Sequence, residues 1–152
     1  MDELRDNFLE NIYKDTIMDH YRNPRHSELL ERYDFAQEEL NPFCGDKILL
    51  QLKLNDSAII QDICAKAEGC TVIKASASLM SMFLTNLHMN EINDRIEKFH
   101  LFLKNELPND KRYLIGCLAE LSVVIDHPVR LKCVLLPFRS LEKILKQYKT
   151  TV

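Results

Sequence analysis

Three cysteines and one aspartate stand out in this chain because together they offer a metal ion three thiolates and a carboxylate. Cys44 and Asp46 lie in the proline- and glycine-containing segment 41–46, Cys70 follows a glycine, and Cys133 precedes an apolar helical run. Zn²⁺ favours four tetrahedral ligands, with thiolate sulfurs at about 2.3 Å and an aspartate oxygen at about 2.0–2.2 Å. The four side chains therefore predict one zinc site.

The other potential ligands have simpler interpretations. Cys64 and Cys117 lie inside strongly patterned segments, and a free cysteine there behaves as a small buried hydrophobic residue. We expect both thiols to have low reactivity. His20 is predicted to be a side chain at a helix end, whereas His127, six residues before Cys133, is kept as a reserve ligand.

The loop position of Cys44 suggests chemistry beyond structural zinc binding. A closed tetrahedral site is normally structural, whereas a functional site has an exchangeable position. If one ligand exchanges, Cys44 is the best candidate, because Cys70 and Cys133 are predicted to be anchored beside helices. The released thiolate could accept a sulfur atom from a persulfide by the same attack on sulfur as in thiol–disulfide exchange.

The charge around the thiols supports anionic sulfur. Cys70 and Cys133 are predicted near helix N-termini, where free N–H groups favour a thiolate. Three thiolates and one carboxylate around Zn²⁺ give a formal charge of about −2. Arg130 and Lys132 lie beside Cys133 and offset part of this charge, and we expect Arg130 to support the site.

The hydrophobic periodicity predicts an α+β fold. Apolar spacing gives a first helix from Leu4 to Tyr21, and period-two alternation gives strands over 47–54 and 58–67, with a further strand over 33–39. Helical spacing returns in four later segments, which are 71–87, 92–103, 114–125 and a last helix beginning near Cys133. We expect a small antiparallel sheet of about three strands packed against about five helices.

Length and composition limit the possible functions. The 152 residues fit a single domain spanning 1–152. The five cysteines are an odd number and the N-terminus lacks an apolar signal segment, which favours a reducing, cytoplasmic location. No apolar run reaches a membrane span of about 20 residues. The 20 basic and 23 acidic residues leave no basic surface for nucleic acid, so the expected partners are proteins and a metal.

Four motifs in order resemble one family of proteins. The segments are DHYRNPR at 19–25, NPFCGD at 41–46, GC at 69–70 with ASASLM at 75–80, and RLKC at 130–133. Together they resemble the IscU, SufU and NifU N-terminal family of iron–sulfur cluster assembly proteins. The resemblance covers nearly the whole chain and implies an α+β fold with a small antiparallel sheet and helices packed on it.

Within that family the chain is most similar to SufU. IscU-like scaffolds carry a histidine immediately before the third cysteine and have a shorter interval between the second and third. Here Lys132 takes the histidine's place, and the interval from Cys70 to Cys133 is long. SufU members bind zinc and take sulfur from a SufS-type cysteine desulfurase, so the resemblance implies a zinc-dependent sulfurtransferase.

The resemblance also implies roles for single residues and partners. The metal ligands would be Cys44, Asp46, Cys70 and Cys133, with Cys44 as the sulfur acceptor and Asp46 beside it as part of the reacting site. Partners would be the desulfurase and downstream iron–sulfur assembly proteins. Segment 128–132 does not match the Leu-Pro-Pro-Val-Lys chaperone site of IscU, so we do not expect an Hsp70-type chaperone to bind. Two alternatives stay open: a scaffold for a transient Fe–S cluster, and a degenerate member with structural zinc.

Overall fold

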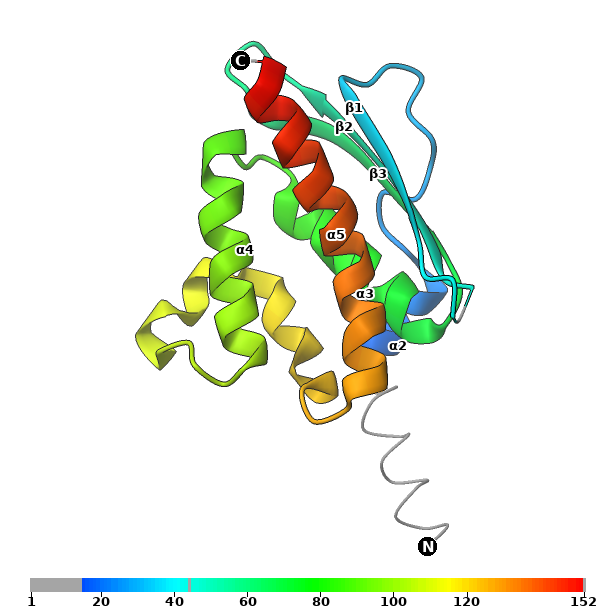
Figure 1. Ribbon diagram of the computed structural model, residues 1–152, viewed down its shortest axis with the longest axis vertical. Coiled ribbons are helices and arrows are strands. Elements are labelled where there is room, and N and C mark those ends of the chain that lie inside the picture. Colours follow the sequence, from blue (N-terminus) through cyan, green and yellow to red (C-terminus); the bar gives the residue numbers. More distant parts are fainter. Residues whose placement is uncertain (1–14, 44, 152) are drawn as a thin grey trace, which may run out of the picture.

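The structure is a computed structural model that describes residues 15–43 and 45–151, and its α+β architecture agrees with the sequence prediction (Figure 1). The elements, in chain order, are α2 (Thr16–Arg22), β1 (Phe35–Leu40), β2 (Lys47–Leu54), β3 (Ile60–Glu68), α3 (Thr71–Leu84), α4 (Met89–Leu103), the 3-10 helices η1 (Asn109–Leu114) and η2 (Gly116–Val124), and α5 (Pro128–Thr151). The part of the predicted first helix before residue 15 lies outside the described residues.

The three strands form one antiparallel sheet in the order β1-β2-β3. Alternation in β2 turns Ile48, Leu50 and Leu52 toward the helices, and all three are fully buried. In the register, Lys47 pairs with Leu40 on one side and with Glu68 on the other. The loop between β1 and β2 therefore ends beside the residues that connect β3 to α3.

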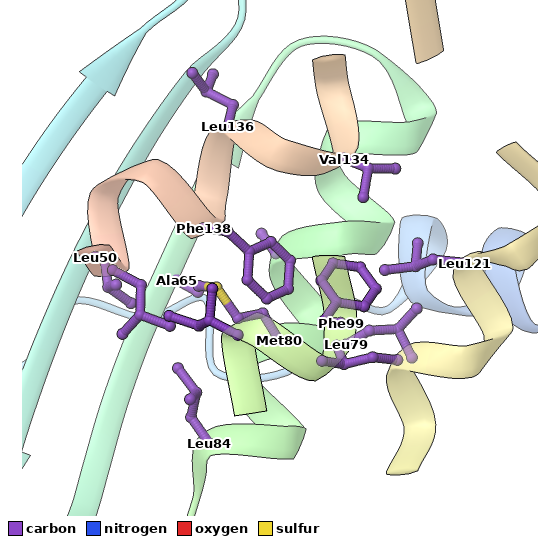
Figure 2. Close-up of a cluster of buried hydrophobic side chains, with 14 of the residues drawn as sticks. Leu50, Ala65, Leu79, Met80, Leu84, Phe99, Leu121, Val134, Leu136 and Phe138 are labelled. Atoms are coloured by element: carbon purple, nitrogen blue, oxygen red, sulfur yellow. The ribbon is translucent and has the colours of Figure 1, made fainter. Parts of the chain in front are cut away.

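The helices form two layers on one face of this sheet. Helix α5 packs along β1 and β2, and α3 packs on β3, whereas α4 contacts α5 and the 3-10 helices (Figure 1). Between them lies the apolar core, where the rings of Phe99 and Phe138 have centroids 4.6 Å apart (Figure 2). Burying each such side chain contributes about 1.5–3 kcal/mol to the free energy of folding.

Small residues bring α3 and α5 close together. Residues Ala75, Ser76 and Ala77 are buried, and the hydroxyl of Ser76 donates a hydrogen bond of 2.8 Å to the carbonyl of Val134. This bond lies one residue after Cys133, so it fixes that part of α5 against α3. The β1–β2 loop, the start of α3 and the first turns of α5 all lie at one end of the molecule (Figure 1).

The segment 114–125, predicted as a helix from its apolar spacing, forms the 3-10 helix η2 and not an α-helix, and the 3-10 helix η1 ends at its first residue. Gly116, the first residue of η2, has a φ of +48°. In η2 the buried residues are Leu118, Leu121 and Val124, spaced three apart, which matches the three residues per turn of a 3-10 helix. A short period-three pattern resembles the 3.6-residue period of an α-helix, and this explains the difference.

The last helix begins earlier than predicted. Helix α5 starts at Pro128, whose fixed φ and missing N–H suit the first helical position. His127 therefore precedes the helix, and Cys133 lies in its second turn rather than at its start. Among residues 15–43 and 45–151, no helix is both long and apolar enough to cross a membrane.

Candidate metal centre

Three of the four predicted ligands meet at the end of the molecule described above. The ligand atoms of Asp46, Cys70 and Cys133 all lie within 4.8 Å of one another. Asp46 directly precedes β2, Cys70 is the residue before α3, and Cys133 belongs to α5. Cys44, the fourth predicted ligand, lies outside the described residues. His127, the reserve ligand, is not part of this group of donor atoms.

The loop that carries Asp46 is held by its own hydrogen bonds. The backbone N–H of Asn41 donates to the carbonyl of Asp46 at 2.8 Å, and the N–H of Gly45 donates to the carbonyl of Asn41 at 2.9 Å. The Asn41 side-chain oxygen also accepts from the N–H of Phe43 at 3.1 Å. Gly45 has a φ of +73°, in the left-handed region that glycine adopts without steric cost. These contacts fix where Asp46 enters the site.

Asp46 joins the loop to the start of α3. Its side chain is buried, with 2% of the residue exposed, and Oδ1 accepts a hydrogen bond of 3.2 Å from the backbone N–H of Cys70. The second oxygen, Oδ2, lies 3.9 Å from Sγ of Cys70. Oδ1 is therefore hydrogen-bonded to the backbone, and Oδ2 faces the thiols.

The pKa values of Cys70 and Cys133 are shifted in opposite directions. A hydrogen bond from Cys133 lowers the pKa of Cys70 to about 6, and the backbone N–H groups of Ile73 and Val72 lower it further, against the effect of burial. The same hydrogen bond to Cys70 raises the pKa of Cys133, and burial and the nearby charges of Cys70 and Asp46 act in the same direction. Cys70 is thus the more acidic thiol of the pair.

The prediction that Cys133 lies near a helix N-terminus is wrong. Because α5 starts at Pro128, the thiol sits beside an intrahelical carbonyl, and Sγ of Cys133 is 3.6 Å from the oxygen of Val129. Free N–H groups at a helix start favour a thiolate, whereas a carbonyl oxygen favours the protonated thiol. For Cys70 the prediction is confirmed, since it is the N-cap of α3.

The thiols and Asp46 open into a cavity of about 650 Å³. Exposed apolar side chains line its mouth, with Phe43 98% exposed, Val129 74% and Leu40 62%. Three cations also line it, namely Arg130, Lys132 and Arg139, and within the described part of the chain none of them has an ion-pair or hydrogen-bond partner.

Sequence reasoning had named two of these three cations. Arg139 was missed, because it lies six positions after Cys133 and no motif marks it. The exposed apolar side chains at the mouth were also missed. Of these, Phe43 could have been recognised from the sequence alone, since a large aromatic residue in a loop beside a predicted ligand is a candidate contact residue.

The donor set fits a zinc ion. Two thiol sulfurs and one carboxylate oxygen are ligands that Zn²⁺ accepts, and in a tetrahedral site two sulfurs would lie about 3.8 Å apart. The described donor atoms, all within 4.8 Å of one another, need only a small contraction to reach that separation. A metal bound by both sulfurs would displace the protons of both thiols.

The remaining cysteines behave as predicted from their patterns. Cys64 is fully buried, and burial raises its pKa. Cys117 is half-buried with Sγ 3.4 Å from the carbonyl of Leu79, and burial likewise raises its pKa. Neither belongs to the group of metal-ligand atoms found among residues 15–43 and 45–151. Both thiols are therefore poor nucleophiles and poor ligands.

Comparisons with known proteins agree with the fold and identify the family. Residues 12–115 match the family model described as the NifU-like N terminal domain. The chain is 33% identical over 135 residues to the zinc-dependent sulfurtransferase SufU of Bacillus subtilis, covering 89% of this chain and 90% of that protein. It is 28% identical over 136 residues to the iron–sulfur cluster assembly scaffold protein IscU of Thermotoga maritima, covering 90% and 94%.

Two solved structures share the fold. A NifU-like protein (N-terminal) from Brucella abortus superposes with a TM-score of 0.81 at 19% identity, covering 95% of this chain and 99% of that one. A putative iron–sulfur cluster assembly scaffold protein for the SUF system from Fervidobacterium islandicum has a TM-score of 0.79 at 24% identity, covering 90% and 98%. At these identities, the structures support the fold alone.

Proposed function

Because this chain belongs to the NifU-like N-terminal domain family, we propose that it acts in iron–sulfur cluster assembly as a zinc-dependent sulfurtransferase. In this proposal Cys44 accepts persulfide sulfur from a SufS-type cysteine desulfurase. The observation that carries it is the convergence of Asp46, Cys70 and Cys133 at the base of an open cavity. A purely structural zinc site needs no such opening.

Four side chains would hold the metal in this proposal: Cys44, Asp46, Cys70 and Cys133. Zinc, when bound, keeps the thiols deprotonated at neutral pH. The protein supplies the rest: the N–H of Cys70 orients Asp46, and the Ser76 to Val134 hydrogen bond holds α5 and α3 at a fixed separation. A loop ligand such as Cys44 is the one that can leave and return with least change elsewhere.

The transfer step is an exchange of one sulfur–sulfur bond for another. The thiolate of Cys44 attacks the terminal sulfur of the persulfide on the desulfurase, and a bond forms between these two sulfurs. The original sulfur–sulfur bond breaks, and the desulfurase cysteine leaves as a thiolate. Atoms and electrons balance without an added oxidant or reductant. Cys44 then carries the persulfide for a downstream assembly protein.

The mouth of the cavity suits docking of another protein. Phe43, Val129 and Leu40 offer exposed apolar surface, which at protein interfaces supplies the buried centre of the contact. Arg130 and Arg139 beside them are exposed to the cavity and unpaired within the described residues. Such cations offset the formal charge of about −2 at a thiolate-rich zinc site. They also attract an acidic surface on the partner.

A second function has specific support. The IscU relative from Thermotoga maritima is named a scaffold, and the same cysteines could hold a transient Fe–S cluster. Lys132 takes the place of the histidine that precedes the third cysteine in IscU-like scaffolds, which favours the sulfurtransferase. Substoichiometric iron with visible charge-transfer absorption in freshly purified protein would favour the scaffold, whereas one zinc per chain supports the sulfurtransferase.

The proposal is tested by measuring sulfide release from cysteine by a SufS-type desulfurase with and without this protein. We expect stimulation by the parent, and loss of stimulation in Cys44→Ala with the melting temperature largely kept. Cys117→Ala is the matched control, since that thiol is half-buried and outside the ligand group, and it should stimulate normally. Stimulation that survives in Cys44→Ala would refute the acceptor role. Mass spectrometry should locate the added sulfur on Cys44.

A further inference from the structure

Gly69 lies against the carboxylate of Asp46 more closely than any side chain would allow. A Cβ added at Gly69 would overlap Oδ1 of Asp46 and would lie 2.8 Å from its Cγ and 3.2 Å from its Cα. Real Cβ atoms essentially never approach another heavy atom closer than 3.0 Å. The carboxylate therefore occupies the space in which residue 69 would otherwise carry a side chain.

This close approach is what lets Asp46 use its two oxygens differently. Oδ1 accepts from the N–H of Cys70, the residue after Gly69, and Oδ2 lies 3.9 Å from Sγ of Cys70. The sheet register brings the two segments together, because Lys47 pairs with Glu68 and the next residues outward are Asp46 and Gly69. Asp46 therefore bridges the β1–β2 loop and the start of α3.

We propose that Gly69 is a positioning residue of the metal centre: its missing side chain allows Asp46 to hold the N–H of Cys70 with one oxygen and to offer the other to the metal. Any side chain at position 69 displaces the carboxylate and so removes the oxygen ligand while leaving the thiols in place. This inference rests on the proposed zinc site and assigns a new role within it.

A second reason for glycine at this position must be separated from the first. Gly69 has a φ of +137°, a backbone conformation that L-residues with side chains rarely adopt, so a substitution also strains the turn. Backbone strain acts whatever residue stands at position 46, whereas the overlap with the carboxylate exists only when Asp46 is present. The two causes therefore differ in how they combine with a change at Asp46.

The test is a double-mutant cycle on zinc affinity with Gly69→Ala, Asp46→Ala and the double variant. Competition against a chromophoric chelator measures the affinity, and the absorption of the Co²⁺-loaded protein reports the ligand set. We expect Gly69→Ala to weaken zinc binding about tenfold, as loss of an orienting contact does. Its Co²⁺ spectrum should match that of Asp46→Ala. In the Asp46→Ala background, Gly69→Ala should change the affinity by less than about threefold.

Equal losses of affinity from Gly69→Ala in both backgrounds would overturn the proposal and assign the effect to backbone strain. Unchanged affinity in Gly69→Ala would overturn it as well. Gly116→Ala is the matched control: Gly116 also has a positive φ, +48°, but its nearest neighbour for a Cβ is Phe83 at 3.6 Å. This control should lower the melting temperature and leave the zinc affinity and the Co²⁺ spectrum unchanged.

The test also has a clear outcome if a variant does not fold or if the parent protein binds no zinc. If Gly69→Ala does not fold but the double variant does, removing the carboxylate has relieved the overlap, which supports the proposal. If neither folds, backbone strain alone explains the glycine. A parent protein that binds no zinc would overturn the proposed function, and the positioning role is then decided separately by the melting temperatures of the four proteins in EDTA. Gly69→Ala must cost less stability in the Asp46→Ala background than in the parent.

Discussion

Two clusters of polar side chains contact helix α3, and they differ in whether their polar atoms are hydrogen-bonded inside the core or face a cavity. At the middle of the helix, Nδ1 of His20 lies 2.7 Å from Oγ of Ser78, which also accepts from the backbone N–H of Arg25 at 2.8 Å. At its start, Asp46 and Cys70 leave ligand atoms facing an open cavity. The first cluster joins segments far apart in the sequence, whereas the second is available for chemistry.

The difference shows how to separate a structural polar cluster from a functional one. His20 and Ser78 are almost wholly buried, with 4% and 0% exposed, and their polar atoms bond to one another. Burial lowers the pKa of His20 and favours the neutral ring. At the metal centre the ligand atoms of Asp46, Cys70 and Cys133 gather beside an open cavity, and the pKa of Cys70 is lowered. Ligand atoms that gather beside a cavity in this way can bind a cation.

Removal of zinc should give the largest loss of stability. It should change the surroundings of the metal centre and leave the His20 cluster unaltered. A metal whose free concentration is about a thousand times its dissociation constant stabilises the folded state by about 4 kcal/mol. For a domain of this size that corresponds to about 10 °C in melting temperature. Calorimetry before and after dialysis against EDTA measures the change, while the NMR signals of the His20 ring should stay unchanged. An unaltered melting temperature would contradict a metal that stabilises the fold.

Replacement of His20 by alanine should give the converse result. It removes a buried ring and its hydrogen bond to Ser78, so we expect a loss of about 2 kcal/mol in the free energy of unfolding. Zinc content should stay at the level of the parent. His100→Ala is the control, since that ring is 41% exposed, and it should change stability little. A loss of zinc in folded His20→Ala would show that the two clusters are coupled.

Arg139→Glu should have a smaller effect, confined to the cavity mouth. The reversal of charge should raise the KM for the desulfurase about fivefold, or about 1 kcal/mol, with kcat and zinc content unchanged. The effect should shrink at high salt, because exposed charges are screened. Lys146→Glu on the same helix is the charge-matched control, as Lys146 is exposed and does not line the cavity. Equal effects of both variants would remove Arg139 from the docking surface.

The strands and the longer helices could be predicted from local patterns. Ile48, Leu50 and Leu52 alternate in β2, and their period alone identifies a half-buried strand. The start of α3 after Cys70 was also predictable. In both cases the residues that determine the element lie within it, so no knowledge of the rest of the fold is needed.

The features that could not be predicted from the sequence depend on contacts between segments that are distant in the chain. Helix α5 begins at Pro128. From the sequence, a proline at this position is equally consistent with the end of one helix and with the start of the next. Which of the two is true determines the surroundings of Cys133. The approach of Gly69 to Asp46 exists only because β2 pairs with β3. Arg139 reaches the cavity only through the packing of α5 on β1. The ligand types were therefore predictable, but the groups that orient them were not.

The smallest expected effect is the part of the pH dependence of stability that arises from His20 in the buried cluster. Because burial and the nearby charge of Arg25 lower the pKa of His20 in the folded chain below its usual value of 6.5, this ring binds more protons in the unfolded chain than in the folded one just below that pH. Stability then rises with pH, so the free energy of unfolding should decline as the pH falls from 7 toward 5.

His20→Gln removes this titration, so its stability should vary less with pH over the same interval. Urea titrations of the metal-free parent, His20→Gln and the exposed-ring control His100→Gln measure it, with EDTA present so that proton competition at the thiols for zinc does not contribute. The control should keep the slope of the parent. The burial of the ring and its short contact to Ser78 argue that His20 accepts a proton less readily in the folded chain than in the unfolded one. If the free energy of unfolding changes equally between pH 7 and 5 in the parent and in His20→Gln, the ring accepts its proton equally readily in both states and this argument is wrong.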